Sequence, residues 1–241
     1  MDLKRIMGVS LNLPIDYNKI KEELLTTRNL WKFSPPWESN MKKAMSGQVF
    51  MSESLDNYLR ADYQNDVTKT VTRKELPGQY IFYLRENLEN INNISRFDYT
   101  KKLPTDKWVW KDHFKKLIPY TIECIEHLPY KHIGCIRVFI TENTFFATHR
   151  DYGWGKDSLS KHYDKCFGLS IIPDTGNVPM KIQSFKDNKV YDIHGNAMLF
   201  NDSAWHGVPY VSGLRITIRI FGEIDYQSFI PYIDYDTLVI E

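Results

Sequence analysis

Short strand-like runs fill the C-terminal half of this chain. Between residues 133 and 224, β-branched and aromatic residues occur in runs separated by turn residues, and no helical periodicity lies between them. The runs are 133–140, 144–150, 167–173, 179–185, 189–193, 196–201 and 214–224. Closely spaced runs of this kind are typical of an antiparallel jelly roll or barrel. We therefore predict an α+β chain with a mainly β core.

Two segments before this β region have the periodicity of amphipathic helices. Residues 16–30 begin with Asp16 as a helix N-cap, and apolar residues such as Ile20 and Leu24 follow at helical spacing. Residues 111–127 repeat apolar side chains at steps of three and four. We expect both helices to cover the outer face of the β core. The segment around 79–90 fits either a strand or a helix.

The length of the chain fits one large domain. A β-sandwich or barrel of about 241 residues commonly stays undivided. We predict a single domain, 1–241, in which a helical supporting region (1–130) precedes the jelly-roll core (131–225) and a tail (226–241). The aromatic part of the tail could close the barrel or meet a second subunit, so a homodimer stays open.

The charge and the apolar pattern limit the classes of partner. The chain has 31 Lys+Arg and 30 Asp+Glu, so there is no electrostatic basis for binding nucleic acid through its phosphates. No apolar stretch approaches the roughly 18 residues of a membrane span, and the N-terminus lacks an apolar run of signal-peptide length. We expect a soluble, cytoplasmic protein with a small uncharged or zwitterionic partner. Cys124, Cys135 and Cys166 are expected to be reduced and mostly buried.

Two histidines and an aspartate have the pattern of a mononuclear metal site. His149-Arg150-Asp151 ends an apolar run, and His206 follows fifty-seven residues later. Side chains two apart on a strand share a face, so His149 and Asp151 point the same way. His206 is expected where a neighbouring strand begins. Two imidazoles and one carboxylate on one side of Fe(II) leave the other side open for a second substrate and O2.

A second His-x-Asp triplet, His162-Tyr163-Asp164, competes with the first. Seven His and 30 acidic residues in 241 predict about one His-x-acid triplet by chance, and two occur. His149 ends a long apolar run of residues, whereas His162 lies in the charged stretch 156–165, which has the composition of a loop. We therefore favour His149 and Asp151 as ligands. His162 and Asp164 are then solvated loop residues or a substrate contact.

The last run places polar side chains on one face of a strand. Arg215, Thr217 and Arg219 alternate with the isoleucines of 216–220, whose face belongs against apolar neighbours. A buried guanidinium needs a matched charge, and a bidentate carboxylate suits its fork best. We therefore expect Arg215 to bind an anionic ligand. Arg219 has three open roles: it binds a substrate carboxylate, it replaces Arg215, or it is a paired structural cation.

These motifs form an ordered pattern over residues 133–224. The pattern is His149-x-Asp151, then Gly195-x-Ala197-x-x-Phe200, then His206-Gly207-Val208, then Gly213-x-Arg215-x-Thr217. It resembles the Fe(II)/2-oxoglutarate-dependent dioxygenases. In that family the His-x-Asp and the distal His bind iron, and an Arg on the last core strand, often with a hydroxyl two residues on, binds the distal carboxylate of 2-oxoglutarate. The resemblance implies those roles for His149, Asp151, His206, Arg215 and Thr217, with Thr in place of the commoner Ser.

The resemblance also implies a fold and an activity. The fold is a double-stranded β-helix of the jelly-roll, cupin-like type, here buttressed by N-terminal helices. The activity is hydroxylation that consumes 2-oxoglutarate and O2 at Fe(II) and releases succinate and CO2. The run Arg137-Val-Phe-Ile-Thr-Glu-Asn143 is similar to that of members acting on free amino acids, so we expect a small-molecule substrate, a free amino acid or an amino-acid-derived metabolite.

Three alternatives stay open on the sequence alone. The first is an aspartyl/asparaginyl-hydroxylase-like enzyme that modifies a peptide or protein side chain. The second is a jelly-roll protein that binds a ligand without turnover. The third is an oxidase with the same iron ligands that does not use 2-oxoglutarate, in which case Arg215 would not be needed for that co-substrate.

Overall fold

Antiparallel strands form most of the described part of the chain. The computed structural model describes residues 6–34, 78–87, 108–149, 167–184, 187, 189–202 and 204–240. The strands are β1 (Ile6–Ser10), β2 (Lys32–Ser34), β3 (Gly78–Tyr83), β4 (Arg85–Asn87), β5 (Trp108–Trp110), β6 (Tyr130–His149), β7 (Phe167–Asp174), β8 (Met180–Gln183), β9 (Val190–Ile193), β10 (Ala197–Asn201), β11 (His206–Ile224) and β12 (Val239–Ile240). The helices are α1 (Tyr17–Thr26), α4 (Asp112–Leu117), α5 (Pro119–Glu126) and α7 (Tyr226–Phe229), with 3-10 turns η2 (Arg28–Leu30), η6 (Ile230–Tyr232) and η7 (Tyr235–Thr237).

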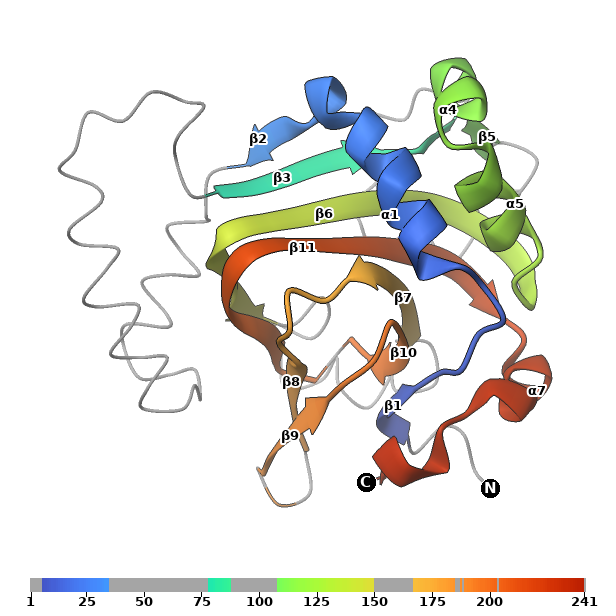
Figure 1. Ribbon diagram of the computed structural model, residues 1–241. Coiled ribbons are helices and arrows are strands. Elements are labelled where there is room, and N and C mark those ends of the chain that lie inside the picture. Colours follow the sequence, from blue (N-terminus) through green and yellow to red (C-terminus); the bar gives the residue numbers. More distant parts are fainter. Residues whose placement is uncertain are drawn as a thin grey trace, which may run out of the picture.

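Two long strands, β6 and β11, pair with each other over most of their length and curve through the molecule (Figure 1). Their register slips between Val211 and Leu214. At this point Asn143 and Gly213 have φ of 49° and 94°, and the Gly213 N–H donates to the Asn143 side chain at 2.8 Å. Irregularities of this kind bend a strand. The predicted runs 133–140 and 144–150 are therefore one bent strand, and the last run begins earlier than predicted, at His206.

The bend divides the core into two layers, which we call the large layer and the small layer. In the large layer, neighbours in order are β10, β7, residues 214–224 of β11 and residues 130–142 of β6. In the small layer they are β9, β8, residues 206–211 of β11 and residues 144–149 of β6. Two four-segment antiparallel layers that share both long strands make a double-stranded β-helix. The predicted jelly roll is confirmed by this pairing.

Strands outside the predicted core widen the large layer. β1 pairs with β10, and β12 pairs with β1, while β3 and β2 extend the opposite edge beyond β6. The expectation of a helical region at 1–130 was therefore incomplete. All five residues of β1 are buried, so the segment lacks the polar alternation that would mark a strand. The described part of the ambiguous segment, 79–87, forms β3 and β4. In the tail, β12 pairs with the edge of β1.

The helices begin and end where local chemistry dictates. The Asp16 carboxylate accepts the N–H groups of Asn18 and Lys19, which caps α1 as predicted. The prediction of one helix over 111–127 was wrong, because Pro119 has no N–H to continue α4 and Ile118 leaves the helical region at φ −134°. The chain instead forms α4 and then α5.

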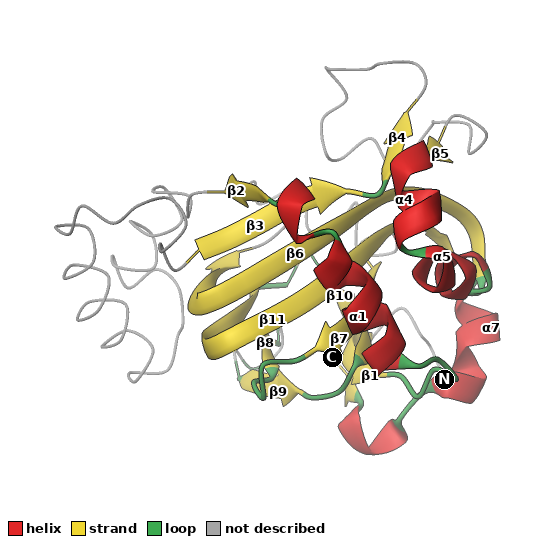
Figure 2. Cartoon of the chain, turned by 45° about the horizontal axis from the view of Figure 1, so that its top comes forward, coloured by secondary structure: helices red, strands yellow, loops and turns green. Residues whose placement is uncertain are grey.

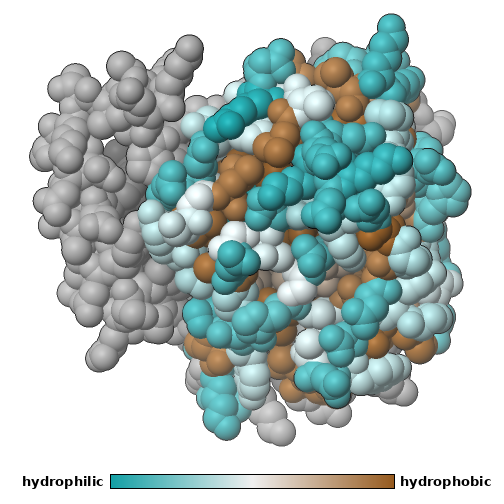
Figure 3. Space-filling view, in the orientation of Figure 1, coloured by the Kyte–Doolittle hydropathy of each residue, from teal (hydrophilic) through white to brown (hydrophobic). Residues whose placement is uncertain are grey.

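Helices α1, α4 and α5 lie on the outer face of the large layer (Figures 1 and 2). The Glu23 carboxylate of α1 accepts the N–H groups of Tyr120 and Thr121 at 2.9 and 2.8 Å, so α1 caps the start of α5. Mostly hydrophilic residues cover the solvent side of this face, with smaller apolar areas between them (Figure 3). In the described part of the chain, no helix is long and apolar enough to cross a membrane.

Two apolar clusters occupy the two faces of the large layer. The outer cluster joins the isoleucines 216, 218 and 220 of β11 to Ile20 and Leu24 of α1 and Ile125 of α5. The inner cluster contains Met7, Ile172, Met180, Ile182, Ile193, Met198, Phe200 and Ala204. The predicted alternation of the last strand is thus confirmed, and Arg215, Thr217 and Arg219 lie on the inner face. Cys124 and Cys135 are buried as expected, and Cys166 lies outside the described residues.

Gly168 of β7 leaves room for a buried guanidinium. A Cβ at this position would overlap the guanidinium of Arg219. We expect Gly168→Ala to lower the free energy of unfolding by about 1–3 kcal/mol, measured by urea denaturation. In an Arg219→Ala background the same substitution should cost less, because the overlapping group is gone. Equal costs in the two backgrounds would show that Arg219 does not pack there.

Candidate metal and carboxylate site

His206, the first residue of β11, is held in one orientation. Its imidazole is 5% exposed, and its Nδ1 lies 2.9 Å from the carbonyl oxygen of Ala204. Since a carbonyl oxygen only accepts, Nδ1 carries the proton, and the lone pair of the neutral ring is on Nε2. The Phe200 ring meets the imidazole edge to face at 4.9 Å. This arrangement suits a histidine that binds a metal through Nε2.

The strand register places the second predicted histidine opposite the first. His149 ends β6, and its Cα partner across the ladder is His206. The Cα atoms of residues directly opposite in an antiparallel pair lie about 4.5–5.5 Å apart. Two positions fifty-seven residues apart in the sequence are therefore neighbours.

The rest of the predicted ligand set stays a prediction. The side chain of His149 and the whole of Asp151 lie outside the described residues, as do His162 and Asp164. Within the residues that are described, no group of three or more His, Cys, Asp or Glu side chains could hold a metal. The other histidines of the described part, His113, His127, His132 and His194, are exposed, which agrees with their predicted surface roles.

Arg215 is a buried cation with an unused donor. Its side chain is 2% exposed, and Nη1 donates to the carbonyl oxygens of Thr175 and Val178 at 2.6 and 2.7 Å. Its Nε is buried without a hydrogen-bond partner among the described residues. Burial lowers the pKa of Arg215 to about 10, against the opposing charge of Asp174. The guanidinium remains protonated at neutral pH, so its environment fits a carboxylate ligand.

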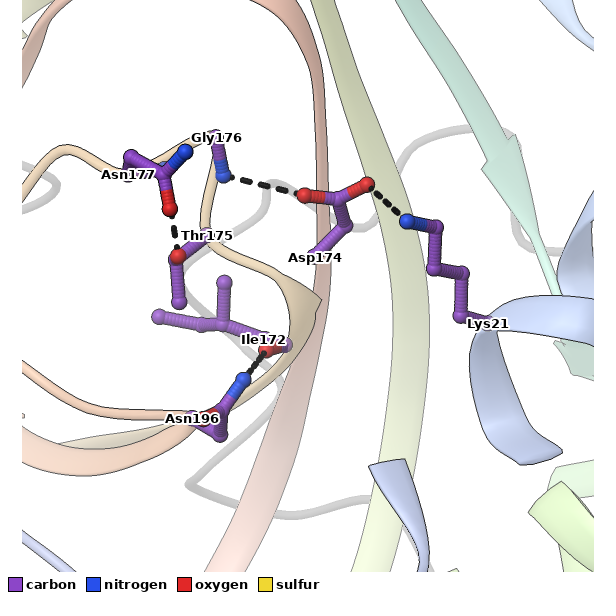
Figure 4. A network of polar contacts seen from close by, with 7 residues as sticks. All are labelled: Lys21, Ile172, Asp174, Thr175, Gly176, Asn177 and Asn196. Atoms are coloured by element: carbon purple, nitrogen blue, oxygen red, sulfur yellow. Dashed lines mark hydrogen bonds and ion pairs between the residues drawn. The ribbon is translucent and has the colours of Figure 1, made fainter. Parts of the chain in front are cut away.

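A tight turn after β7 holds Arg215. Gly176 and Asn177 both have positive φ, and the Val178 N–H donates to the Thr175 carbonyl at 3.3 Å. Asp174 accepts the Gly176 N–H at 3.0 Å and pairs with Lys21 of α1 at 2.7 Å (Figure 4). Sequence reasoning missed this role. The Thr-Gly-Asn sequence is typical of a turn, but it carries no sign of which cation the turn carbonyls will meet.

Arg219 forms a buried ion pair with Asp202. Its Nη2 donates to Asp202 Oδ2 at 2.7 Å, and the two side chains are 6% and 3% exposed. Its Cζ lies 4.2 Å from the centroid of the Phe200 ring. The structure therefore forms the paired cation that was one of the three roles open to Arg219, and its predicted contact with a co-substrate stays a prediction. Thr217 lies half-buried on the same face, between the two arginines.

Asp202 lies in the turn before His206, and its ion pair with Arg219 ties that turn to β11. Sequence analysis did not single it out. We expect Asp202→Ala to lower the free energy of unfolding by about 3–5 kcal/mol, because it removes the carboxylate that pairs with the buried guanidinium of Arg219. Asp112→Ala, which removes an exposed partner of Lys115, should change the free energy of unfolding far less, because water and salt screen an exposed ion pair. Urea denaturation of both variants measures the difference, and similar costs would show that the buried pair adds nothing.

Comparisons with known proteins give distant likenesses only. No family model matches the sequence, and no curated protein is similar to it. One similar solved structure is a prolyl hydroxylase from Trichoplax adhaerens in complex with a hypoxia inducible factor oxygen degradation domain peptide fragment. It is 10% identical, with 94% of this chain and 86% of that chain covered and a TM-score of 0.48.

Two further solved structures are similar at the same level of identity. One is an oxidoreductase of the 2OG-Fe(II) oxygenase family from Burkholderia pseudomallei, with 10% identity, 88% and 93% of the two chains covered and a TM-score of 0.38. The other is a prolyl-4-hydroxylase from Pseudomonas putida, with 10% identity, 91% and 92% covered and a TM-score of 0.40. Values this low do not carry an argument about activity, which rests on the strand pairing and side chains described above.

Proposed function

We propose that this chain is an Fe(II)- and 2-oxoglutarate-dependent dioxygenase that hydroxylates a C–H bond of a small substrate, a free amino acid or an amino-acid-derived metabolite. The observation that carries the proposal is the pairing of His206 with His149 in a jelly roll whose inner face also holds the buried cation Arg215. A metal-ligating pair of histidines and a carboxylate-binding cation are two of the parts that such a reaction needs from the protein.

Each residue has a defined task in this proposal. His206 binds Fe(II) through Nε2, and His149 and Asp151 complete the ligand set. Arg215 holds the distal carboxylate of 2-oxoglutarate, with the Thr217 hydroxyl beside it. When bound, the iron and 2-oxoglutarate supply the activation of O2, with succinate and CO2 as co-products.

Other parts of the chain position these groups. The Ala204 carbonyl fixes the ring orientation of His206, and the turn at 175–178 fixes the guanidinium of Arg215. The inner cluster, which includes Phe200 against His206, places apolar side chains beside the proposed metal and lowers its exposure to water. The chain thus orients His206 and Arg215 and limits the access of water to the proposed metal site.

Release of succinate tests the proposal. The protein is incubated with Fe(II), 2-oxoglutarate, O2 and a panel of the twenty L-amino acids and of short peptides, and succinate and product mass are measured. We expect at least one free amino acid to raise succinate release, gain the mass of one oxygen atom and lose this effect when the iron is chelated. Stimulation by peptides alone would favour the peptide-modifying alternative. Stoichiometric iron without any succinate would favour a non-catalytic binding protein.

A further inference from the structure

Lys21 and Asp174 form an ion pair between helix α1 and the end of strand β7. The Lys21 Nζ lies 2.7 Å from Asp174 Oδ2, and the two side chains are 38% and 18% exposed (Figure 4). Asp174 is the last residue of β7, and α1 lies on the outer face of the large layer. The Asp174 carboxylate therefore links a helix outside the β core to the turn that contacts Arg215.

An irregularity in β7 directs Asp174 towards α1. Two residues of β7, 172–173, face the single residue Thr217 of β11. Ile172 belongs to the inner cluster, and strict alternation would place the side chain of Asp174 on that inner side as well. The extra residue changes the alternation, and the proline at this point has no N–H to donate to the ladder, which a bulge tolerates. Asp174 thus reaches Lys21 on the outer side.

The turn at 175–178 connects Asp174 to the guanidinium of Arg215. Asp174 Oδ1 accepts the Gly176 N–H at 3.0 Å, and carbonyl oxygens at both ends of the turn accept from Arg215 Nη1 at 2.6 and 2.7 Å. Gly176 has φ of 58°, and a Cβ at this position would overlap Val211. Because the turn packs this closely against β11, a shift of the turn also shifts the two carbonyls that hold Arg215.

The charge and the position of Asp174 have opposite effects on an anion bound by Arg215. Burial, the larger effect, lowers the pKa of Arg215 to about 10, and the charge of Asp174 acts in the other direction. A carboxylate that interacts with a cation competes with any anion that the cation binds, so the charge alone weakens binding. Lys21 and solvent both reduce this effect. The position matters more, because a misplacement of about 1 Å can cost about 100-fold.

We propose that Lys21 and Asp174 are positioning residues that fix the guanidinium of Arg215 for the distal carboxylate of 2-oxoglutarate. This inference rests on the proposed function and adds two residues from the outer side of the sheet to its co-substrate site. Both residues act through the turn and do not touch the co-substrate. Their loss therefore weakens the binding of 2-oxoglutarate, while the iron ligands and the reacting groups stay in place.

Succinate release at varied 2-oxoglutarate tests the role of the pair. We expect Asp174→Ala to raise the KM for 2-oxoglutarate at least about 10-fold, while kcat and the affinity for Fe(II) stay within about twofold. Asp174→Asn should raise the KM less, by about threefold, because its amide oxygen still accepts the Gly176 N–H. Lys21→Met should also raise it about threefold. Lys21→Arg, which keeps the cation, should restore the wild-type KM.

A matched ion pair elsewhere in the chain serves as the control. Lys115 and Asp112 of α4 are paired at 2.9 Å, and Lys115→Met and Asp112→Asn should leave the KM unchanged. A lowered KM in Asp174→Ala would show that Asp174 acts through its charge, and this would overturn the inference while succinate release still supports a dioxygenase. An unchanged KM in Asp174→Ala or in Lys21→Met would overturn it as well. Lys21 is partly exposed, so Lys21→Met decides the matter even if Asp174→Ala does not fold.

A double-mutant cycle measures the same link without turnover. Free energies of unfolding in urea are compared for the wild type, Asp174→Ala, Arg215→Leu and the double variant. We expect non-additive losses, because Asp174 has no guanidinium left to position once Arg215 is replaced. Additive losses would overturn the inference. Non-additive losses without succinate release in any assay would overturn the proposed activity and leave the positioning of Arg215 standing.

Discussion

An alanine in place of His206 is expected to weaken Fe(II) binding by more than about 100-fold and to end the 2-oxoglutarate-dependent release of succinate. The reason is that the substitution removes the imidazole that, in the proposed site, binds the metal through Nε2 while Nδ1 donates to the Ala204 carbonyl. Loss of a partner that merely orients a metal ligand typically costs about 10–100-fold in affinity or activity, so loss of the ligand itself costs more. Anaerobic calorimetry measures the affinity.

A matched histidine elsewhere in the chain serves as the control. His194 lies between β9 and β10, and its side chain is exposed. His194→Ala should bind Fe(II) as the wild type does and should keep full succinate release. Wild-type iron affinity in His206→Ala would place the metal somewhere else. Loss of affinity in both variants would indicate a general loss of folding, which circular dichroism detects.

Replacing Arg215 by leucine is expected to raise the KM for 2-oxoglutarate at least about 30-fold while Fe(II) still binds. Truncation of one partner of a buried, hydrogen-bonded charge pair costs about 2–5 kcal/mol, and each 1.4 kcal/mol is about tenfold in affinity. Arg215 is 2% exposed, so solvent does not screen the lost interaction. Steady-state succinate release at varied 2-oxoglutarate gives the KM.

The outcome for Arg215 distinguishes three accounts. Arg215→Lys keeps the charge but loses the fork that reaches Thr175, Val178 and a carboxylate together, so its KM should lie between those of the wild type and Arg215→Leu. Arg28→Leu, an exposed surface change, should leave the KM unaltered. An unchanged KM in Arg215→Leu would indicate that Arg219 binds the distal carboxylate of 2-oxoglutarate, or it would favour an oxidase that does not use 2-oxoglutarate.

The parts of the fold that could be predicted are those with a local signal in the sequence. Alternation in the last strand separated the isoleucines from Arg215 and Arg219, and the structure places the two sets on opposite faces as expected. Turn residues between the runs marked β7, β8, β9 and β10 to within about two residues. The position of His206 at the start of a strand was also predicted, because only a short turn separates it from the run that forms β10.

Other parts depend on contacts between distant segments and carry no local signal. Every residue of β1 is buried because its side chains pack into both apolar clusters, and its sequence alone resembles any short apolar run. Asp202 owes its importance to Arg219, seventeen residues further along, and the turn at 175–178 owes its importance to Arg215. Such pairings are set by strand order, which the sequence pattern does not specify.

The account depends on three side chains, His149, Asp151 and His206, holding one ferrous ion. Anaerobic equilibrium dialysis of the wild type and of the three single alanine variants against Fe(II) and 2-oxoglutarate tests this directly. We expect one iron and one 2-oxoglutarate per wild-type chain, and loss of both ligands together in each variant. Full iron occupancy at wild-type affinity in any one of the three variants would contradict the account.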